Sequence, residues 1–300
     1  MKTVINQRIV LAKRPVGEPK HSDFRIEQVE LNELKQGEIL LKTIYLSLDP
    51  YMRGRMSDAP SYAAPVEIGE VMVGGTVSQV VASKNPKFKE GEWVLSGNGW
   101  QGYAISNGSA CQSLGMQPEH PSWALGILGM PGFTAYMGLL DIDQPKAGET
   151  LVVAAAMGPV GATVGQIGKI KGCRVVGVAG GAEKCRYAVE ELGFDTCINH
   201  HDENFAEQLQ QAVPTGIDIY YENVGVKCLM RYGHCLTLRH VYRCVVWFPS
   251  ITLPSKHKGQ TVYRALFPPF KKSVFACRAL LFLMIMAVSI RNSISKCLTG

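Results

Sequence analysis

The pattern of hydrophobic and polar positions changes twice along these 300 residues. In the first 125 residues, short runs rich in β-branched side chains alternate with glycine-rich breaks. Such runs occupy Glu38–Leu48 and Val71–Ser83, and Phe88–Ser106 has the form of a strand, a glycine-rich turn and a second strand. Many short strands joined by glycine turns predict a compact, barrel-like β domain over residues 1–125.

The second pattern begins near residue 150, where apolar runs alternate with amphipathic segments. Apolar, β-branched runs predict strands at Thr150–Ala156, Arg174–Gly180, Thr196–His200 and Ile217–Val224. Segments with helical spacing separate them, at Gly161–Gly172, Ala182–Gly193 and Glu203–Val213. A βαβαβαβ order predicts a doubly wound parallel sheet of the Rossmann type. The expected fold class is therefore α/β, with a β-rich domain followed by a nucleotide-binding domain over residues 126–225.

The third pattern begins after Val224, where periodicity disappears together with the acidic residues. Residues 1–222 hold all 25 acids and 19 of the 31 Lys+Arg, a balance of 19 − 25 = −6. Residues 223–300 hold the other 12 basic residues and no acid, a balance of +12. Because these basic residues are scattered among apolar ones, we expect no nucleic-acid partner. The longest apolar run, Ala279–Val288, is too short to span a bilayer, so we expect no membrane partner either.

The strongest chemical motif is VVAAAMGPVGATVGQIGKIKG, which follows the first predicted strand of the second pattern and opens a helix. Gly158, Pro159, Val160 and Gly161 would form a loop whose backbone can approach a pyrophosphate, and Gly165 would let the helix pack near the strand. The helix N-terminus adds free N–H groups and a positive dipole end. The alternative is a glycine-rich helix start without a ligand.

The end of the next predicted strand indicates which dinucleotide this loop would hold. An NAD site usually places an acid there for the ribose hydroxyls. This chain has Gly180 and Gly181 instead, followed by Lys184, which could neutralise a 2′-phosphate. The sequence therefore favours NADPH as the cofactor. The alternative is that Lys184 is a solvated lysine at a helix start.

Cysteine usage and the N-terminus carry less information. The nine cysteines show no CxxC spacing, so a zinc ribbon or thioredoxin-type site has no support and we expect no metal. The first residues, Met1–Pro15, lack the apolar core of a signal peptide. We therefore expect reduced thiols and a cytoplasmic location.

Several motifs together resemble one enzyme family. These are LSLDPYMRGRM, GMPGFTAYMGL, the glycine motif above, GFD and YYENVG, in this order between Met1 and Gly225. They are similar to the zinc-independent medium-chain dehydrogenase/reductases, and within them to the leukotriene B4 12-hydroxydehydrogenase/prostaglandin reductase branch with its curcumin-reductase-like members. The resemblance implies a GroES-like barrel domain, a Rossmann domain and a homodimer. It also implies NADPH-dependent reduction of a carbon–carbon double bond conjugated to a carbonyl, in a small enone or enal.

The resemblance assigns roles to individual residues. Gly158 to Gly161 would hold the pyrophosphate, and Lys184 the 2′-phosphate. Asn223, Met130 and Thr134 would lie near the nicotinamide, and Tyr51 would line the substrate pocket. Two positions depart from the family: Gly181 often is Ser there, and His200, counted with Gly180 among the cofactor-binding residues, often is Tyr. The zinc-dependent cousins carry a Gly-His-Glu motif and a four-cysteine lobe, and this chain has neither.

The resemblance stops at Gly225, and a shifted reading frame would explain why. If the tail is back-translated and each codon starts at the third base, Pro249–Pro254 can encode Gln-Tyr-Asn-Ala-Thr, and two further stretches also resemble family segments, in family order. We therefore expect that residues 226–300 are out of frame, that the Rossmann domain is truncated and that activity is impaired. The alternatives are a genuine basic tail, a non-catalytic remnant, or a quinone reductase of the same superfamily.

Overall fold

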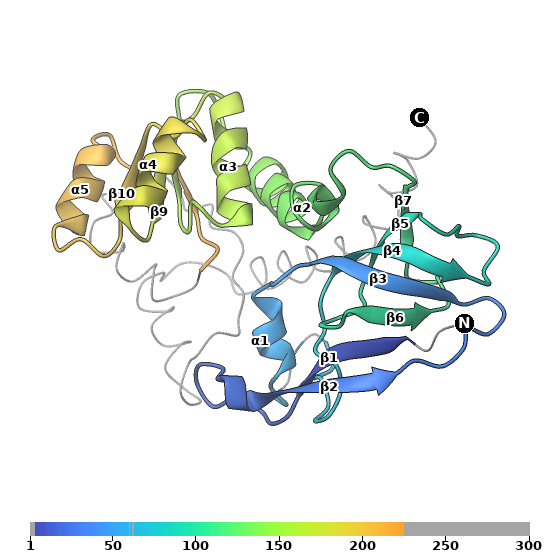
Figure 1. Ribbon diagram of the computed structural model, residues 1–300. Helices are drawn as coiled ribbons and strands as arrows, with labels where there is room; N and C mark the ends of the chain where they lie inside the picture. The colour runs from blue at the N-terminus through green and yellow to red at the C-terminus, as the bar shows by residue number, and fades with distance from the viewer. Residues whose placement is uncertain (1–3, 60, 62, 225–300) are drawn as a thin grey trace. The chain divides into compact units, whose positions relative to one another are not determined.

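The computed structural model describes residues 4–59, 61 and 63–224 (Figure 1). The predicted out-of-frame tail, residues 226–300, lies outside the described residues. Two parts of the chain are treated separately below. The β-rich part runs from β1 to β7, and the parallel-sheet part runs from α2 to β11; the short 3₁₀ helix η2 (Pro121–Leu125) lies between them in sequence.

The β-rich part contains an antiparallel ribbon and a five-stranded sheet (Figure 1). In the ribbon, β1 (Ile5–Leu11) pairs with β2 (Phe24–Glu30), and the 3₁₀ helix η1 (His21–Asp23) precedes β2. The sheet has the order β6-β3-β4-β5-β7 with antiparallel neighbours throughout. Its strands are β3 (Ile39–Leu46), β4 (Thr76–Ser83), β5 (Trp93–Ser96), β6 (Tyr103–Ser106) and β7 (Gln112–Gly115). The prediction of a β-rich first domain is confirmed.

A short helix interrupts the β-rich part between β3 and β4. The segment LSLDPYMRGRM forms α1 (Tyr51–Arg55). Pro50 precedes the helix with φ −56° and ψ −30°, and proline is favoured at helix starts because its fixed φ matches helical geometry. Met52 is buried, and Tyr51 and Arg53 lie beside it in the same helix.

The parallel-sheet part has the strand order β10-β9-β8-β11, and all three pairings are parallel. The strands are β8 (Thr150–Val153), β9 (Arg174–Ala179), β10 (Thr196–Asn199) and β11 (Ile219–Tyr221). The helices are α2 (Met130–Tyr136), α3 (Pro159–Ile170), α4 (Ala182–Glu190) and α5 (Phe205–Ala212), and the π-helical segment η3 (Met137–Asp143) continues α2. The predicted order of strands and helices is confirmed.

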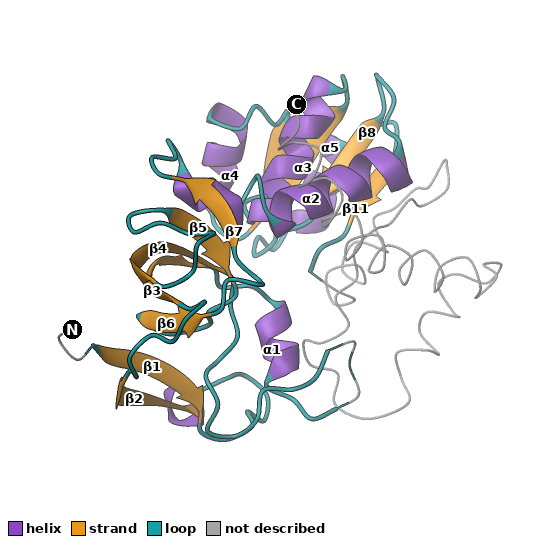
Figure 2. Cartoon of the chain, turned by 90° about the vertical axis from the view of Figure 1, so that its right-hand side faces the viewer, coloured by secondary structure: helices purple, strands orange, loops and turns teal. Residues whose placement is uncertain are grey.

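Helices cover both faces of the parallel sheet, as its strand sequences require (Figure 2). Alternate residues of a strand point to opposite faces. Leu151 and Val153 of β8 pack in one apolar cluster, with residues of α2, α3 and α4. Val152 of β8 packs in the other, with Phe205 and Leu209 of α5. The sheet is therefore doubly wound, which explains why its strands are continuously apolar.

Among the described residues, no helix combines the length and the apolar character that crossing a membrane requires.

Candidate nucleotide-binding site

The loop between β8 and α3 has the backbone form that the glycine motif predicts. Ala155 adopts φ +46°, a left-handed conformation, and its carbonyl accepts the N–H of Gly158 at 2.8 Å. Gly158 is extended and caps α3, and its carbonyl accepts Ala162 N–H at 2.8 Å. A Cβ on Gly161 would overlap the Ala155 carbonyl oxygen. The loop therefore folds back tightly onto the start of α3.

This geometry suits an anion. Pro159 is the first residue of α3, where its missing N–H costs nothing. The N–H groups of Val160 and Gly161 belong to the first helical turn, whose donors have no acceptors within the helix. The helix dipole adds partial positive charge at the same place. Gly158 to Gly161 therefore present backbone donors and positive dipole charge at the start of α3, which fits the pyrophosphate of a dinucleotide.

Gly165 lets α3 approach a phenylalanine rather than the strand itself. A Cβ on Gly165 would overlap the ring of Phe194, which belongs to the GFD motif and is almost fully buried. The same ring lies 2.8 Å from the Cβ position of Gly177 in β9. Phe194 therefore fills the space between α3 and β9 that the two glycines leave open. Close packing at Gly165 was predicted against the strand, and the group in contact is instead the ring of Phe194.

The ends of β9 and β10 bring together Gly180 and His200, two of the predicted cofactor-binding residues. Gly180 follows β9 directly, and its Cβ position lies 3.1 Å from Nε2 of His200, which follows β10. Gly181 has φ +96°, where a side chain would be strained, so the serine common in the family would need a different backbone here. Lys184 is exposed in the first turn of α4.

The segment after β11 holds Asn223 in a fixed loop. Glu222 is buried; its Oε2 accepts the hydroxyl of Tyr220 at 2.7 Å, and its Oε1 accepts the N–H of Val224 at 2.6 Å. Between these anchors, the Oδ1 of Asn223 is buried and has no hydrogen-bond partner among the described residues. A buried carbonyl oxygen without a donor is costly. Asn223 can therefore accept a hydrogen bond from a ligand amide.

A hydroxyl contact joins α2 to the same strand. Tyr221 Oη donates to the carbonyl oxygen of Thr134 at 3.0 Å, and both residues are buried. A Cβ on Gly138 would overlap the Tyr221 hydroxyl, so this approach also requires a glycine in η3. Met130, at the start of α2, is 36% exposed. The contact places Thr134 and its helix against β11, two residues before Asn223.

Tyr51 stands apart from this group, in α1 of the β-rich part. The preceding acid, Asp49, is partly buried, and that burial raises the pKa of its carboxyl above the ordinary value, although a hydrogen bond from Ser47 opposes the shift. Arg53 donates to the carbonyl oxygens of Pro15 and Gly17, at 3.3 and 2.9 Å, which holds α1 on a neighbouring loop. The substrate role of Tyr51 stays a prediction.

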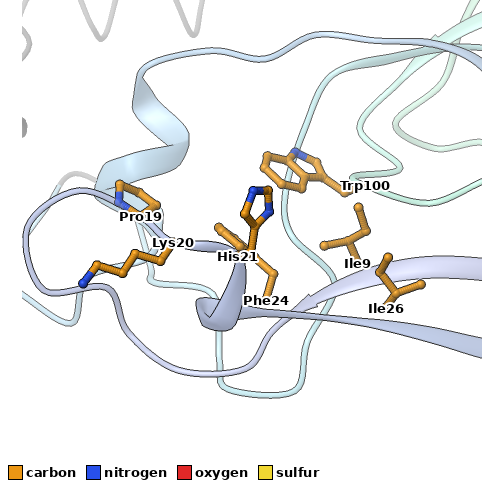
Figure 3. A pocket seen from close by; sticks show the side chains of 7 residues that line it. All are labelled: Ile9, Pro19, Lys20, His21, Phe24, Ile26 and Trp100. Atoms are coloured by element: carbon orange, nitrogen blue, oxygen red, sulfur yellow. The ribbon is translucent and has the colours of Figure 1, made fainter.

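The β-rich part contains a cavity of about 510 Å³ beside the β1–β2 ribbon (Figure 3). Trp100 and Phe24 form part of its wall, with ring centroids 5.5 Å apart. The other lining residues are Ile9, Pro19, Lys20, His21 and Ile26. None of the predicted site residues lines this cavity, so it forms no part of the nucleotide site.

Sequence reasoning missed three residues near the site. Tyr221 and Glu222 order the segment around Asn223, and His201 packs beside His200. The motif YYENVG contains Tyr221 and Glu222. Its pattern does not show that the hydroxyls of Tyr220 and Tyr221 form hydrogen bonds on opposite faces of the sheet. His201 could have been found from its position beside His200, directly after a predicted strand.

In the part of the chain that the structure describes, no group of three or more His, Cys, Asp and Glu side chains is arranged to hold a metal ion.

Two family models match the chain. An N-terminal domain of oxidoreductases matches residues 7–114, and a domain described as a zinc-binding dehydrogenase matches residues 159–240. The second match continues past Gly225, where the sequence analysis placed the end of the resemblance. Together they cover the β-rich part and most of the parallel-sheet part.

Characterised proteins are similar over the same region. The NADPH-dependent curcumin reductase of Escherichia coli K12 is 68% identical over 222 residues, which are 74% of this chain and 64% of that enzyme. The NADP(+)-dependent 2-alkenal reductase of Nicotiana tabacum is 40% identical over 75% of this chain and 68% of its own length. The chain thus spans a little less than two thirds of the length of the curcumin reductase.

A solved structure agrees with the fold. The crystal structure of CurA from Vibrio vulnificus in complex with NADPH superposes with a TM-score of 0.78 and 49% identity, covering 96% of this chain and 89% of that chain.

Proposed function

This chain belongs to the zinc-independent medium-chain dehydrogenase/reductases, in the group that contains curcumin and prostaglandin reductases, and on that premise we propose that it is an NADPH-dependent reductase of conjugated carbon–carbon double bonds. In this proposal, residues 1–125 form the GroES-like substrate domain and residues 126–225 the NADPH-binding domain. The substrate class is a small α,β-unsaturated ketone or aldehyde. A curcumin reductase and a 2-alkenal reductase among the relatives support that class.

The observation that carries the proposal is the cradle between β8 and α3. Because a Cβ on Gly161 would overlap the Ala155 carbonyl, the loop leaves space only for backbone. Gly158, Pro159, Val160 and Gly161 would hold the pyrophosphate of NADPH there. Gly180, Lys184 and His200 would surround the 2′-phosphate. The absence of an acid directly at the end of β9, where Gly180 and Gly181 stand, favours NADPH over NADH.

The residues after β11 would position the reacting end of the cofactor. When bound, NADPH supplies a hydride for the β-carbon of the substrate. Asn223 Oδ1, which is buried without a donor among the described residues, would accept a hydrogen bond from the nicotinamide carboxamide. Thr134 and Met130 would border the ring from α2, and Tyr51 would line the substrate pocket. Such positioning residues act by holding the reacting atoms in a productive orientation.

The test is to measure NADPH consumption at 340 nm with a 2-alkenal, a conjugated ketone and a quinone as separate substrates. The proposal predicts oxidation with the first two, faster than with the quinone, and faster with NADPH than with NADH. A quinone preference would favour the quinone reductase alternative. Binding of NADPH without turnover on any substrate would favour the non-catalytic alternative.

We also propose that a lost base near the codons of Gly225 and Val226 produced residues 226–300, and that activity is impaired as a result. The supports are the absence of Asp and Glu after Glu222 and the family-like segments in the shifted frame. The gene's nucleotide sequence tests this directly: restoring one base should open a long frame similar to the relatives. The restored protein should then turn over faster than this chain, and form the homodimer that the family resemblance implies. A cytoplasmic location is part of the same proposal.

A further inference from the structure

Two histidines converge on the end of β9 beside the predicted 2′-phosphate site. β10 ends at Asn199, and His200 and His201 follow directly. Their ring centroids lie 4.0 Å apart, with 47° between the ring planes. A Cβ at Gly180 would lie 3.1 Å from Nε2 of His200 and 3.3 Å from Nε2 of His201. Both imidazoles therefore direct a nitrogen towards the strand end that leads to Lys184.

The backbone around the second histidine is fixed by one amide side chain. Asn199 Oδ1 accepts the N–H of Gly181 at 2.9 Å and the N–H of His201 at 3.2 Å. Asn199 Nδ2 donates to Asp202 Oδ1 at 2.6 Å. Asn199 thus ties the end of β9 to the turn after β10. The side chain of His201 itself stays exposed and within reach of a ligand.

The charged groups around this turn determine what the pair can bind. Glu183 and Lys184 lie in the first turn of α4, and Asp202 and Glu203 follow the histidines. The Asp202 carboxylate already accepts hydrogen bonds from Asn199 and Gln208. A lysine supplies a charge that is constant near neutral pH, whereas a histidine supplies one that changes there. A phosphate held by both kinds of residue should bind more tightly as the pH falls.

We propose that His201 is a third, protonation-dependent contact to the 2′-phosphate of NADP(H), in addition to Lys184 and His200. The inference rests on the proposed function, because it concerns the cofactor of the same site. It adds a specificity-determining residue that the family resemblance did not assign. Nucleotides with a 2′-phosphate should bind more tightly at pH 6.5 than at pH 8.0, and nucleotides without one should not.

The experiment uses the full chain and isothermal titration calorimetry with adenosine 2′,5′-bisphosphate and with 5′-AMP, at pH 6.5 and 8.0. These probes occupy only the adenosine half of the site, so the outcome does not depend on the nicotinamide end. Phosphate monoesters remain mostly dianionic at pH 6.5 because their second pKa is about 6. A phosphate contact that requires the protonated imidazole predicts roughly three- to fivefold tighter binding of the bisphosphate at the lower pH.

Two variants at this position sharpen the result. His201→Gln should weaken binding of the bisphosphate and reduce its pH dependence, with His200 supplying the remainder, and leave 5′-AMP binding unchanged. His201→Lys should bind the bisphosphate tightly at both pH values, because its charge is constant. His21→Gln, in the β-rich part, is the matched control and should behave as the unmodified chain. Titrations in buffers of different ionisation enthalpy should show proton uptake in the unmodified chain and less in His201→Gln.

The outcomes separate this inference from the proposed function. If the bisphosphate and NADPH bind but His201→Gln keeps the full pH dependence and affinity, the inference fails and the proposed function stands. If neither NADPH nor the bisphosphate binds at any pH, the proposed function fails and the inference fails with it.

Discussion

The parallel-sheet part and the β-rich part bury their apolar side chains in different ways. In the parallel sheet, two large clusters lie on opposite faces, and Leu151, Val152 and Val153 of one strand are all completely buried. In the β-rich part, the described apolar residues divide into three smaller clusters. Ile5 and Ile26 on the ribbon strands are 59% and 63% exposed. A side chain in a sheet covered on both faces has little space around it, so a substitution there disturbs the packing. A side chain on an open strand face can be replaced with less effect.

Two kinds of glycine occur in both parts of the chain. In α3 and β9, Gly165 and Gly177 have no side chain, and the ring of Phe194 occupies the space that a side chain would fill. In the β-rich part, Gly37, Gly69 and Gly115 have positive φ and no atom within 4 Å of the Cβ position. Gly99 of the β-rich part is also a closely packed position, and Gly181 and Gly193 of the parallel-sheet part also have positive φ and open space. The first kind of glycine is required by packing, and the second by the backbone of a turn.

The largest expected effect comes from Leu209→Ala in α5. Leu209 is completely buried in the second cluster, so truncation removes apolar contacts and leaves a cavity. We expect a loss of about 2–5 kcal/mol in the free energy of unfolding. Urea denaturation followed by circular dichroism measures it. Ile26→Ala, on the ribbon, is the control and should change stability by about 0.5 kcal/mol or less. Equal effects would contradict the comparison.

Gly165→Ala should have the next largest effect. The added methyl group overlaps the ring of Phe194, which is almost fully buried and cannot move freely. Overpacking of this kind costs about 1–3 kcal/mol. The matched control is Gly97→Ala in the β-rich part, where no atom lies within 4 Å of the Cβ position. A thermal midpoint for Gly165→Ala as high as that of Gly97→Ala would show that the Phe194 ring can shift away from α3.

Tyr221→Phe tests the hydroxyl that joins α2 to β11. The substitution removes the hydroxyl that donates to the carbonyl oxygen of Thr134. We expect the free energy of unfolding to fall by about 1 kcal/mol. NADPH affinity should also fall, because the helix that borders the predicted nicotinamide site loses its anchor. Tyr45→Phe in the β-rich part is the control, since that ring is 42% exposed. Unchanged stability and affinity in Tyr221→Phe would mean that packing alone holds α2.

The smallest effect is electrostatic and depends on pH. Burial opposes ionisation of Asp195, but hydrogen bonds from Lys169 and from the Val175 N–H outweigh it and lower the pKa of the Asp195 carboxyl. A lowered folded-state pKa stabilises the fold above the unfolded-state value, and this stabilisation disappears as the pH falls through the folded-state value. Asp195→Asn should therefore cost roughly 0.5 kcal/mol at pH 7, after allowance for solvent screening, and less at pH 3.

The counterpart in the β-rich part is Glu27, whose pKa is lowered by hydrogen bonds from Arg25 and Arg8. Asp195 accepts a backbone N–H as well as a lysine side chain, whereas the hydrogen bonds that lower the pKa of Glu27 come from two arginine side chains, so Glu27→Gln should change the pH dependence of stability less than Asp195→Asn. Chemical denaturation at a series of pH values compares the two. A larger change in the pH dependence of stability for Glu27→Gln would show that the arginine pairs of Glu27 contribute more than the hydrogen bonds of Asp195.

Much of the parallel-sheet part could be predicted from sequence because each strand is covered on both faces and is therefore apolar without interruption. The ends of the strands were less predictable. The last one was expected at Ile217–Val224 and forms only Ile219–Tyr221. Asp218 accepts the N–H of Thr150, and Glu222 turns to cap the following loop, so polar bonds shorten the strand at both ends.

The ribbon and the pairwise contacts of the site could not be predicted. Polar residues interrupt both strands of the ribbon: β1 carries Asn6, Gln7 and Arg8 between its apolar residues, and β2 mixes apolar with charged and amide residues. The candidate loop at Gly158 to Gly161 was predictable because its glycines follow a strand within a few residues. The contacts of Phe194 with Gly165 and of His201 with Gly180 join residues far apart in sequence, and a single sequence carries no record of such pairs.

The left-handed conformation of Ala155 has a consequence for the thermodynamics of cofactor binding. A non-glycine residue rarely adopts positive φ, so the fold must hold this bend against a local conformational cost. The loop is consequently bent before any ligand arrives, and it loses little conformational entropy on association. Replacing Ala155 with glycine would relieve the strain but let the empty loop sample more shapes, and the gain in fold stability would be opposed by weaker affinity. The methyl group of Ala155 therefore lowers the stability of the fold and raises the affinity for the cofactor.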